Sequence, residues 1–233
     1  MKKLCLILAV IFAEFAAHGA TVSWGTNDNT GIINTSSTAL PISNWIQIGY
    51  FATLSDAQIT TDAATPAGTA LLAADFVKFS AGQVNATQGP GGLFLGNQTN
   101  TGFTDQQIYL WAMQSSNNST LSTAESSVQQ QAIVYVPKGT TPNTSYGAAW
   151  KFPGDPGTPI TIDADALQTT GTKTLVGTFI PGANNASLQS AGFGASNNAL
   201  QLANVAAVPE PSTFTFGAMA ALFAAGTRWR NRR

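Results

Sequence analysis

Hydrophobic and polar residues alternate along several short stretches of the chain, and each such stretch predicts a β-strand. The clearest are residues 42–51 (ISNWIQIGYF) and 107–113 (QIYLWAM), where successive side chains point to opposite faces of a sheet. The first stretch predicts a strand with one buried face. The second is apolar on both faces, which predicts a central strand. The other predicted strands are residues 21–25, 93–95, 132–137, 160–162, 174–180 and 200–208.

Two short segments carry helix signals instead. Ser55 is a favourable N-cap residue and predicts one helical turn over residues 56–59. Thr65-Pro66 predicts the start of a longer helix that continues through Phe79 and ends at Gly82. Many short strands, frequent turns and one or two short helices predict a mainly β domain, with the architecture of an antiparallel β-sandwich or jelly-roll.

The first 19 residues have the pattern of a secretory signal peptide. A basic start at Lys2 and Lys3 precedes an apolar stretch at residues 4–13. Small residues at Ala17 and Gly19 predict cleavage after Gly19, with cleavage after Ala20 as the alternative. We therefore expect residues 1–19 to be removed on export and residues 20–207 to form one secreted β-rich domain.

The last 26 residues have three parts in a fixed order. Residues 208–212 contain two prolines, which interrupt a strand or helix and predict an exposed hinge. Residues 213–227 carry no charge and predict a transmembrane helix of about 22 Å, short for a hydrocarbon core of about 30 Å. Residues 228–233 are predicted to hold the C-terminus in the cytoplasm by the positive-inside rule. Their four arginines are Arg228, Arg230, Arg232 and Arg233.

This order of hinge, apolar stretch and arginine cluster resembles the PEP-CTERM sorting signal of Gram-negative bacteria. The residues that match the hinge motif are Val208, Pro209, Glu210, Pro211 and Ser212. The resemblance implies that the membrane enzyme exosortase recognises the segment and removes the helix. The protein would then pass from a transient anchor in the inner membrane to the cell surface or an exopolysaccharide matrix. An ordinary C-terminal membrane anchor is the alternative interpretation.

The domain between the two signals also resembles, more diffusely, an uncharacterised domain that recurs in PEP-CTERM proteins. The resemblance rests on four stretches and implies a shared β fold without known catalytic residues. The stretches are Trp24-Gly25, Ile48-Gly49-Tyr50-Phe51, residues 107–112 (QIYLWA) and Trp150-Lys151-Phe152-Pro153.

Charge and residue usage narrow the classes of function. Residues 21–208 contain nine acidic residues, four lysines and no arginine, a net charge of −5 that the whole-chain value of −1 conceals. Nucleic acid is therefore excluded as a partner. Cys5 and His18 both lie in the leader, which excludes disulfides, Ser-His-Asp triads and zinc sites built from cysteine or histidine in the mature span. An enzyme that uses paired carboxylates stays open.

Two groups of residues are candidate binding sites. Asp163 and Asp165 are two positions apart, so on a strand both carboxylates share a face, and with Asp155 they form a candidate Ca²⁺ site. The alternative is a solvated strand edge. Trp150 lies beside Lys151 and a Pro/Gly turn, and is the tryptophan that we expect to be exposed. With Asn143 these two residues form a candidate glycan site, against the alternative of a buried aromatic core.

These observations favour a non-enzymatic, exported surface or extracellular-matrix protein that is sorted by an exosortase. A carbohydrate-binding module for exopolysaccharide is the main alternative, and a secreted hydrolase that uses carboxylates is the third. We expect no cofactor other than Ca²⁺ at the aspartate site. The exposure of the tryptophans distinguishes the first two hypotheses.

Overall fold

The structure is a computed structural model that describes residues 19–25, 30–84, 95–138, 150–154, 159–168 and 171–206. These residues are mainly β, with short helices between the strands. The strands are β1 (Ala20–Gly25), β2 (Thr30–Ile33), β3 (Trp45–Phe51), β4 (Phe76–Gln83), β5 (Leu95–Asn100), β6 (Tyr109–Ser115), β7 (Val128–Tyr135), β8 (Ile160–Asp163), β9 (Lys173–Val176), β10 (Thr178–Ile180), β11 (Asn198–Gln201) and β12 (Ala203–Asn204). The helices are α2 (Asp56–Asp62), α3 (Pro66–Asp75), α4 (Leu121–Glu125), α5 (Ala186–Ser190) and the 3-10 helix η1 (Ala164–Gln168).

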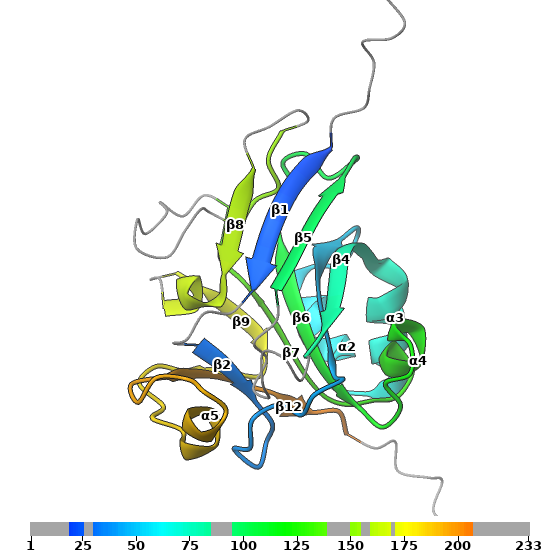
Figure 1. Ribbon diagram of the computed structural model, residues 1–233. Helices are drawn as coiled ribbons and strands as arrows, with labels where there is room; N and C mark the ends of the chain where they lie inside the picture. Colours follow the sequence, from blue (N-terminus) through cyan, green and yellow to red (C-terminus); the bar gives the residue numbers. More distant parts are fainter. Residues whose placement is uncertain are drawn as a thin grey trace, which may run out of the picture.

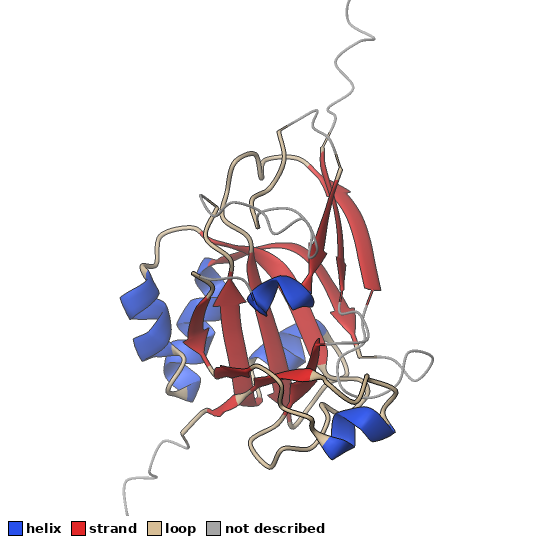
Figure 2. Cartoon of the chain, turned by 90° about the vertical axis from the view of Figure 1, so that its left-hand side faces the viewer, coloured by secondary structure: helices blue, strands red, loops and turns tan. Residues whose placement is uncertain are grey.

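The strands form one large sheet and two small ones. The six-stranded sheet has the order β12-β7-β6-β3-β4, and β9 also pairs with β7. The small sheets have the orders β5-β1-β8 and β10-β11-β2. Helices α2, α3 and α4 cover one face of the large sheet, and the small sheets lie on its other side (Figures 1 and 2).

Both faces of the large sheet are therefore buried. On β6, Leu110 and Ala112 point into the cluster shared with the small sheets, and Trp111 and Met113 point into the cluster under the helices. This confirms the prediction of a central strand that is apolar on both faces. On β3, Ile46 and Ile48 are buried as predicted. The expectation that β3 has only one buried face is wrong, since Gln47 on the opposite face is 0% exposed.

Sheet pairing overrides the predicted helix at residues 66–82. Helix α3 begins at Pro66 as expected but ends at Asp75, and Phe76 starts β4 with an extended backbone. The reason is non-local: β4 pairs antiparallel with β3 along its length. Asp75 joins the two ends of the β3–β4 connection, since its carboxylate accepts hydrogen bonds from Thr53 N and Leu54 N. The helical spacing of the apolar residues does not indicate this pairing.

Further outcomes concern the direction of strand pairing, the continuity of one strand and the helices. Strands β1 and β8 are parallel, as are β11 and β2, so the sheets are mostly but not wholly antiparallel. The predicted strand at residues 174–180 is split into β9 and β10 at Gly177, whose φ of +85° favours glycine. The predicted turn after Ser55 is confirmed by α2, where Ser55 and Gln58 form a capping box. The described residues contain more helices than the one or two expected.

A hydrogen-bond network fastens the helix layer to the large sheet. The side chain of Gln131 on β7 is fully buried, and its Oε1 accepts a hydrogen bond from Trp111 Nε1 at 2.8 Å. Its Nε2 donates to the Ala63 carbonyl at 2.8 Å and to Thr69 Oγ1 at 3.1 Å. One amide thus joins β6, β7, the C-terminal end of α2 and the first turn of α3. Buried polar groups of this kind stabilise a fold only while each partner is present.

Replacing Gln131 with leucine should therefore destabilise the domain. Trp111 Nε1 and the Ala63 carbonyl lose their partner, so we expect a loss of about 2–4 kcal/mol in the free energy of unfolding, measured in urea. Gln129→Leu is the matched control, because Gln129 lies on the same strand with an exposed side chain. It should change stability by less than about 0.5 kcal/mol. Equal effects of the two variants would contradict this role for Gln131.

Candidate functional site

The backbone at the C-terminal end of the domain is held by several distant segments. Strand β12 pairs antiparallel with β7 at the edge of the large sheet. Immediately after it, Val205 N donates to the Gln129 carbonyl at 2.8 Å, and Ala206 N donates to the Ala64 carbonyl at 2.9 Å. Ala64 lies between α2 and α3. The chain is thus fixed up to Ala206, beside the start of α3.

Strand β12 is short because it shares the edge of β7 with β9. Strand β12 pairs with Gln130 and Gln131, and β9 pairs with residues 133–135 of the same strand. The edge of β7 is therefore occupied by two separate pieces of chain. The Asn204 side chain adds a contact, since its Oδ1 accepts a hydrogen bond from Thr35 Oγ1 at 3.3 Å.

The predicted signals themselves lie outside the described residues. This applies to the signal peptide up to residue 18 and to the hinge motif at Val208, Pro209, Glu210, Pro211 and Ser212. It also applies to the predicted helix at residues 213–227 and to Arg228, Arg230, Arg232 and Arg233. In the part of the chain that is described, no helix is long and apolar enough to cross a membrane.

A carboxylate and two phenols meet between α2 and the large sheet. Asp56, the first residue of α2, accepts a hydrogen bond from Tyr135 Oη at 2.6 Å and a longer one from Tyr109 Oη at 3.5 Å. The two tyrosine rings pack with their centroids 4.8 Å apart. No local sequence motif marks this cluster, because the two tyrosines are 53 and 79 positions from Asp56.

The electrostatics of this cluster keep the phenols protonated. Burial, followed by the charge and hydrogen bond of Asp56, raises the pKa of Tyr109 to about 12. Burial and the Asp56 hydrogen bond also raise the pKa of Tyr135 well above its usual value. A tyrosine that acts as a base or nucleophile needs the opposite shift. The cluster is therefore suited to fasten α2 to the sheet.

A half-buried carboxylate, that of Glu125, lies at the end of α4. Gln47 Nε2 donates a hydrogen bond to Glu125 Oε1 at 3.2 Å. Burial raises the pKa of Glu125, and the hydrogen bond and the charge of Lys78 reduce this shift only in part. A folded-state pKa above the unfolded value means that the charged carboxylate is disfavoured in the fold. Glu125 thus lowers stability at neutral pH, and this cost disappears as the pH falls through its folded-state pKa.

Glu125→Gln should therefore stabilise the domain at neutral pH. Glutamine keeps the acceptor for Gln47 but carries no charge, so we expect a gain of less than about 1 kcal/mol, limited because water screens a half-buried group. The gain should shrink as the pH falls through the raised pKa of Glu125, because the wild-type carboxyl then loses its charge. Urea unfolding across this range measures both effects. A variant that is less stable than wild type at every pH would show that the charge itself strengthens the bond to Gln47.

The predicted calcium ligands are not arranged as the sequence suggested. Strand β8 ends at Asp163, and Asp165 lies in η1, so the two residues do not belong to one strand. Asp165 is fully buried. Asp155 and the side chain of Asp163 lie outside the description. Within the described residues, no group of three aspartate, glutamate, histidine or cysteine side chains could hold a metal ion. The Ca²⁺ site stays a prediction.

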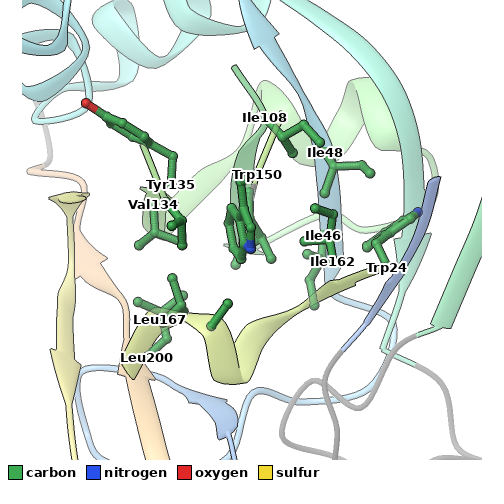
Figure 3. Packing of buried hydrophobic residues seen from close by; sticks show 14 of the residues in the cluster. Trp24, Ile46, Ile48, Ile108, Val134, Tyr135, Trp150, Ile162, Leu167 and Leu200 are labelled. Atoms are coloured by element: carbon green, nitrogen blue, oxygen red, sulfur yellow. The ribbon is translucent and has the colours of Figure 1, made fainter. Parts of the chain in front are cut away.

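The expected exposure of Trp150 is wrong. Its side chain is 0% exposed and lies in the core between the sheets, close to Ile108 and Val134 (Figure 3). The cause is strand-like pairing at a distance: Trp150 O accepts a hydrogen bond from Ile108 N at 2.9 Å, and Gln107 forms a β-bridge with Lys151. Trp24 and Trp111 are buried as well. Trp150 therefore has no free face to offer a sugar.

The other predicted glycan residues have separate fates. The Lys151 ammonium lies 2.7 Å from the Asp105 carboxylate in an exposed ion pair. This hydrogen bond and the lysine charge lower the pKa of Asp105. Asn143 lies outside the described residues. Trp150 and Lys151 are thus neighbours in sequence, but the Trp150 side chain lies in the core and the Lys151 side chain lies at the surface.

Truncation of Trp150 tests its place in the core. Trp150→Ala should lower the free energy of unfolding by about 3–5 kcal/mol, as expected for large core aromatics. Lys151→Ala is the neighbouring control, and should cost less than about 1 kcal/mol because it removes only an exposed ion pair. Denaturant unfolding of both variants measures the difference. A Trp150→Ala protein as stable as wild type would contradict the buried position.

A shallow hollow lies between the segment after β2 and α5. Its volume is about 610 Å³, and most of its lining is apolar. Ile42 at its rim is 46% exposed. The residues that line it are Thr38, Ala39, Pro41, Ile42, Ser187, Ser190 and Ala191. None of these is charged, so the hollow has no ionisable group for catalysis.

No protein-family model matches the chain, and no curated protein and no solved structure matches it. The function must therefore be inferred from the residues and contacts described above. The junction at Ala206 is the feature that links the folded domain to the predicted sorting segment.

Proposed function

We propose that the chain is an exported, non-enzymatic surface or extracellular-matrix protein that is sorted through its C-terminal segment by an exosortase. The observation that carries this proposal is the order of parts at residues 208–233, which follows at once on a folded domain. The last described hydrogen bond is made by Ala206, and the hinge motif begins at Val208. The hinge therefore emerges from an anchored point of the domain, where a membrane enzyme can reach it.

The N-terminal end of the domain supports export in the same way. Strand β1 begins at Ala20, which is 1% exposed and pairs with Asn100. Cleavage after Gly19 leaves this strand whole, whereas cleavage after Ala20 would remove its first residue. The buried position of Ala20 thus favours the first of the two predicted cleavage sites.

The roles of the ionisable side chains support a structural function for the domain. Asp56 fastens α2, Asp75 joins the two ends of the β3–β4 connection, Asp105 pairs with Lys151, and Glu125 accepts a hydrogen bond from Gln47. Each of these carboxylates contacts a group of the domain itself, and Glu125 does so at a cost in stability at neutral pH. The burial of Trp150 removes the residue that motivated the carbohydrate-binding alternative. We also infer a sandwich-like architecture, supported by the apolar cluster enclosed between the large sheet and the small ones.

Replacing Pro209-Glu210-Pro211 with three alanines should block sorting. The rigid hinge is lost, so we expect the full-length protein, still carrying its C-terminal segment, to stay in the inner membrane fraction of the producing cell. Mass spectrometry of the protein from each fraction identifies both termini. Pro181→Ala is the matched control, since Pro181 is an exposed proline in a turn of the domain. It should leave processing unchanged.

Two outcomes would contradict the proposal. Release of a shortened protein from the triple-alanine variant would exclude recognition of the hinge. A wild-type protein that keeps residues 213–233 in the membrane would instead indicate a permanent C-terminal anchor.

A further inference from the structure

The outer face of α3 is apolar and uncovered. Helix α3 has no charged side chain before its last residue, Asp75. Its inner side is formed by Gly68, Thr69 and Leu72, which are buried. Leu71 points the other way and is 59% exposed. The other exposed residues between the start of the helix and Asp75 are Pro66, Ala67, Ala70 and Ala74.

This composition is unusual for a helix on the surface of a domain. A surface helix normally presents charged and polar residues to water, and a helix that is apolar on all sides is normally covered. We call the exposed residues Pro66, Ala67, Ala70, Leu71 and Ala74 the outer α3 face. The large sheet and α2 cover the opposite side of the helix, so nothing in the described chain covers this face.

The outer α3 face is close to the point where the chain leaves the domain. Ala206 N is bonded to the Ala64 carbonyl, and α3 begins two residues later at Pro66. Six residues, 207–212, then separate Ala206 from the uncharged stretch at residues 213–227. Six residues reach at most about 20 Å. If residues 213–227 lie in a bilayer, the start of α3 is held within about that distance of its surface.

We propose that the outer α3 face rests on the lipid bilayer while the C-terminal segment anchors the protein. This inference rests on the proposed function, and it adds a partner for the folded domain, namely the interfacial region of the lipid bilayer. The tether keeps the local concentration of the bilayer high, so a face of one leucine and several small residues suffices for contact. The acidic domain has no attraction to anionic lipids, so the contact depends on apolar burial and is best tested on zwitterionic lipid.

Such a contact would orient the domain during sorting. With α3 against the membrane, the junction at Ala206 and the following hinge are held at the bilayer surface, where a membrane enzyme acts. Helix α5 packs on the small sheet β10-β11-β2, far from α3 (Figure 1), and it faces away from the bilayer in this arrangement.

A fluorescent probe on α3 tests the proposal in the full-length chain. The mature span has no cysteine, so Leu71→Cys in a Cys5→Ala background gives one labelling site. Ser190→Cys on α5 is the matched control, because both positions are exposed and helical. Each protein carries an environment-sensitive dye and is reconstituted in phosphatidylcholine vesicles that contain lipids with a nitroxide near the headgroup. Flotation on a density gradient reports anchoring independently.

We expect several-fold stronger quenching of the dye at position 71 than at position 190, with both proteins floating with the vesicles. Floating proteins in which both dyes report water would overturn the inference and leave the anchor intact. Proteins that do not float would overturn the anchor and the inference together. A dye at position 71 that is shielded without vesicles would show that the chain's own residues 213–227 or a second copy covers this face, which also overturns the proposal. Circular dichroism confirms that the exposed substitutions leave the fold unchanged.

Discussion

The large sheet is covered on both faces, and the rest of the structure depends on how its polar groups are satisfied there. A strand buried on both sides has no water to bond a polar side chain. Gln131 solves this problem for β7 by bonding Trp111, Ala63 and Thr69, and in doing so it determines where α2 and α3 meet. The Ala63–Ala64 turn then supplies the carbonyl that fixes Ala206. The position of the chain at Ala206 is thus linked to this buried amide through the Ala63–Ala64 turn.

Local sequence patterns correctly predicted the elements whose conformation does not depend on pairing with a distant segment. The alternation in residues 107–113 was sufficient to predict β6, since each face stays apolar whatever covers it. The segment after Asp75 was predicted wrongly, because its apolar spacing suits a helix while its pairing with β3 makes it a strand. Trp150 was placed wrongly for the same reason. Its backbone joins Ile108, which is 42 positions away in sequence, and this carries the side chain into the core.

The candidate sites differ in the same way, since some are contiguous in sequence and others are assembled from distant residues. The predicted sorting segment is contiguous in sequence, so its order of hinge, apolar stretch and arginines is visible without a structure. The Asp56–Tyr109–Tyr135 cluster is assembled from three distant positions and has no sequence signature. The predicted aspartate site depended on β8 continuing to Asp165, and the start of η1 at Ala164 removed that geometry. A rule that infers a shared face from residue spacing holds only within one continuous strand or helix.

The proposed export and processing would require a fold that is independent of both ends of the chain. Within the described residues, the last backbone contact of the domain is made at Ala206 and the first strand begins at Ala20. A cut within residues 208–212 therefore removes no described contact, and a cut after Gly19 leaves β1 whole. Without cysteine in the mature span, disulfides cannot reinforce the domain, so burial in its two main apolar clusters must supply the stability. A single domain of this length can bury enough surface for that purpose. Removal of the proposed anchor would thus leave the described interactions that fold the domain in place.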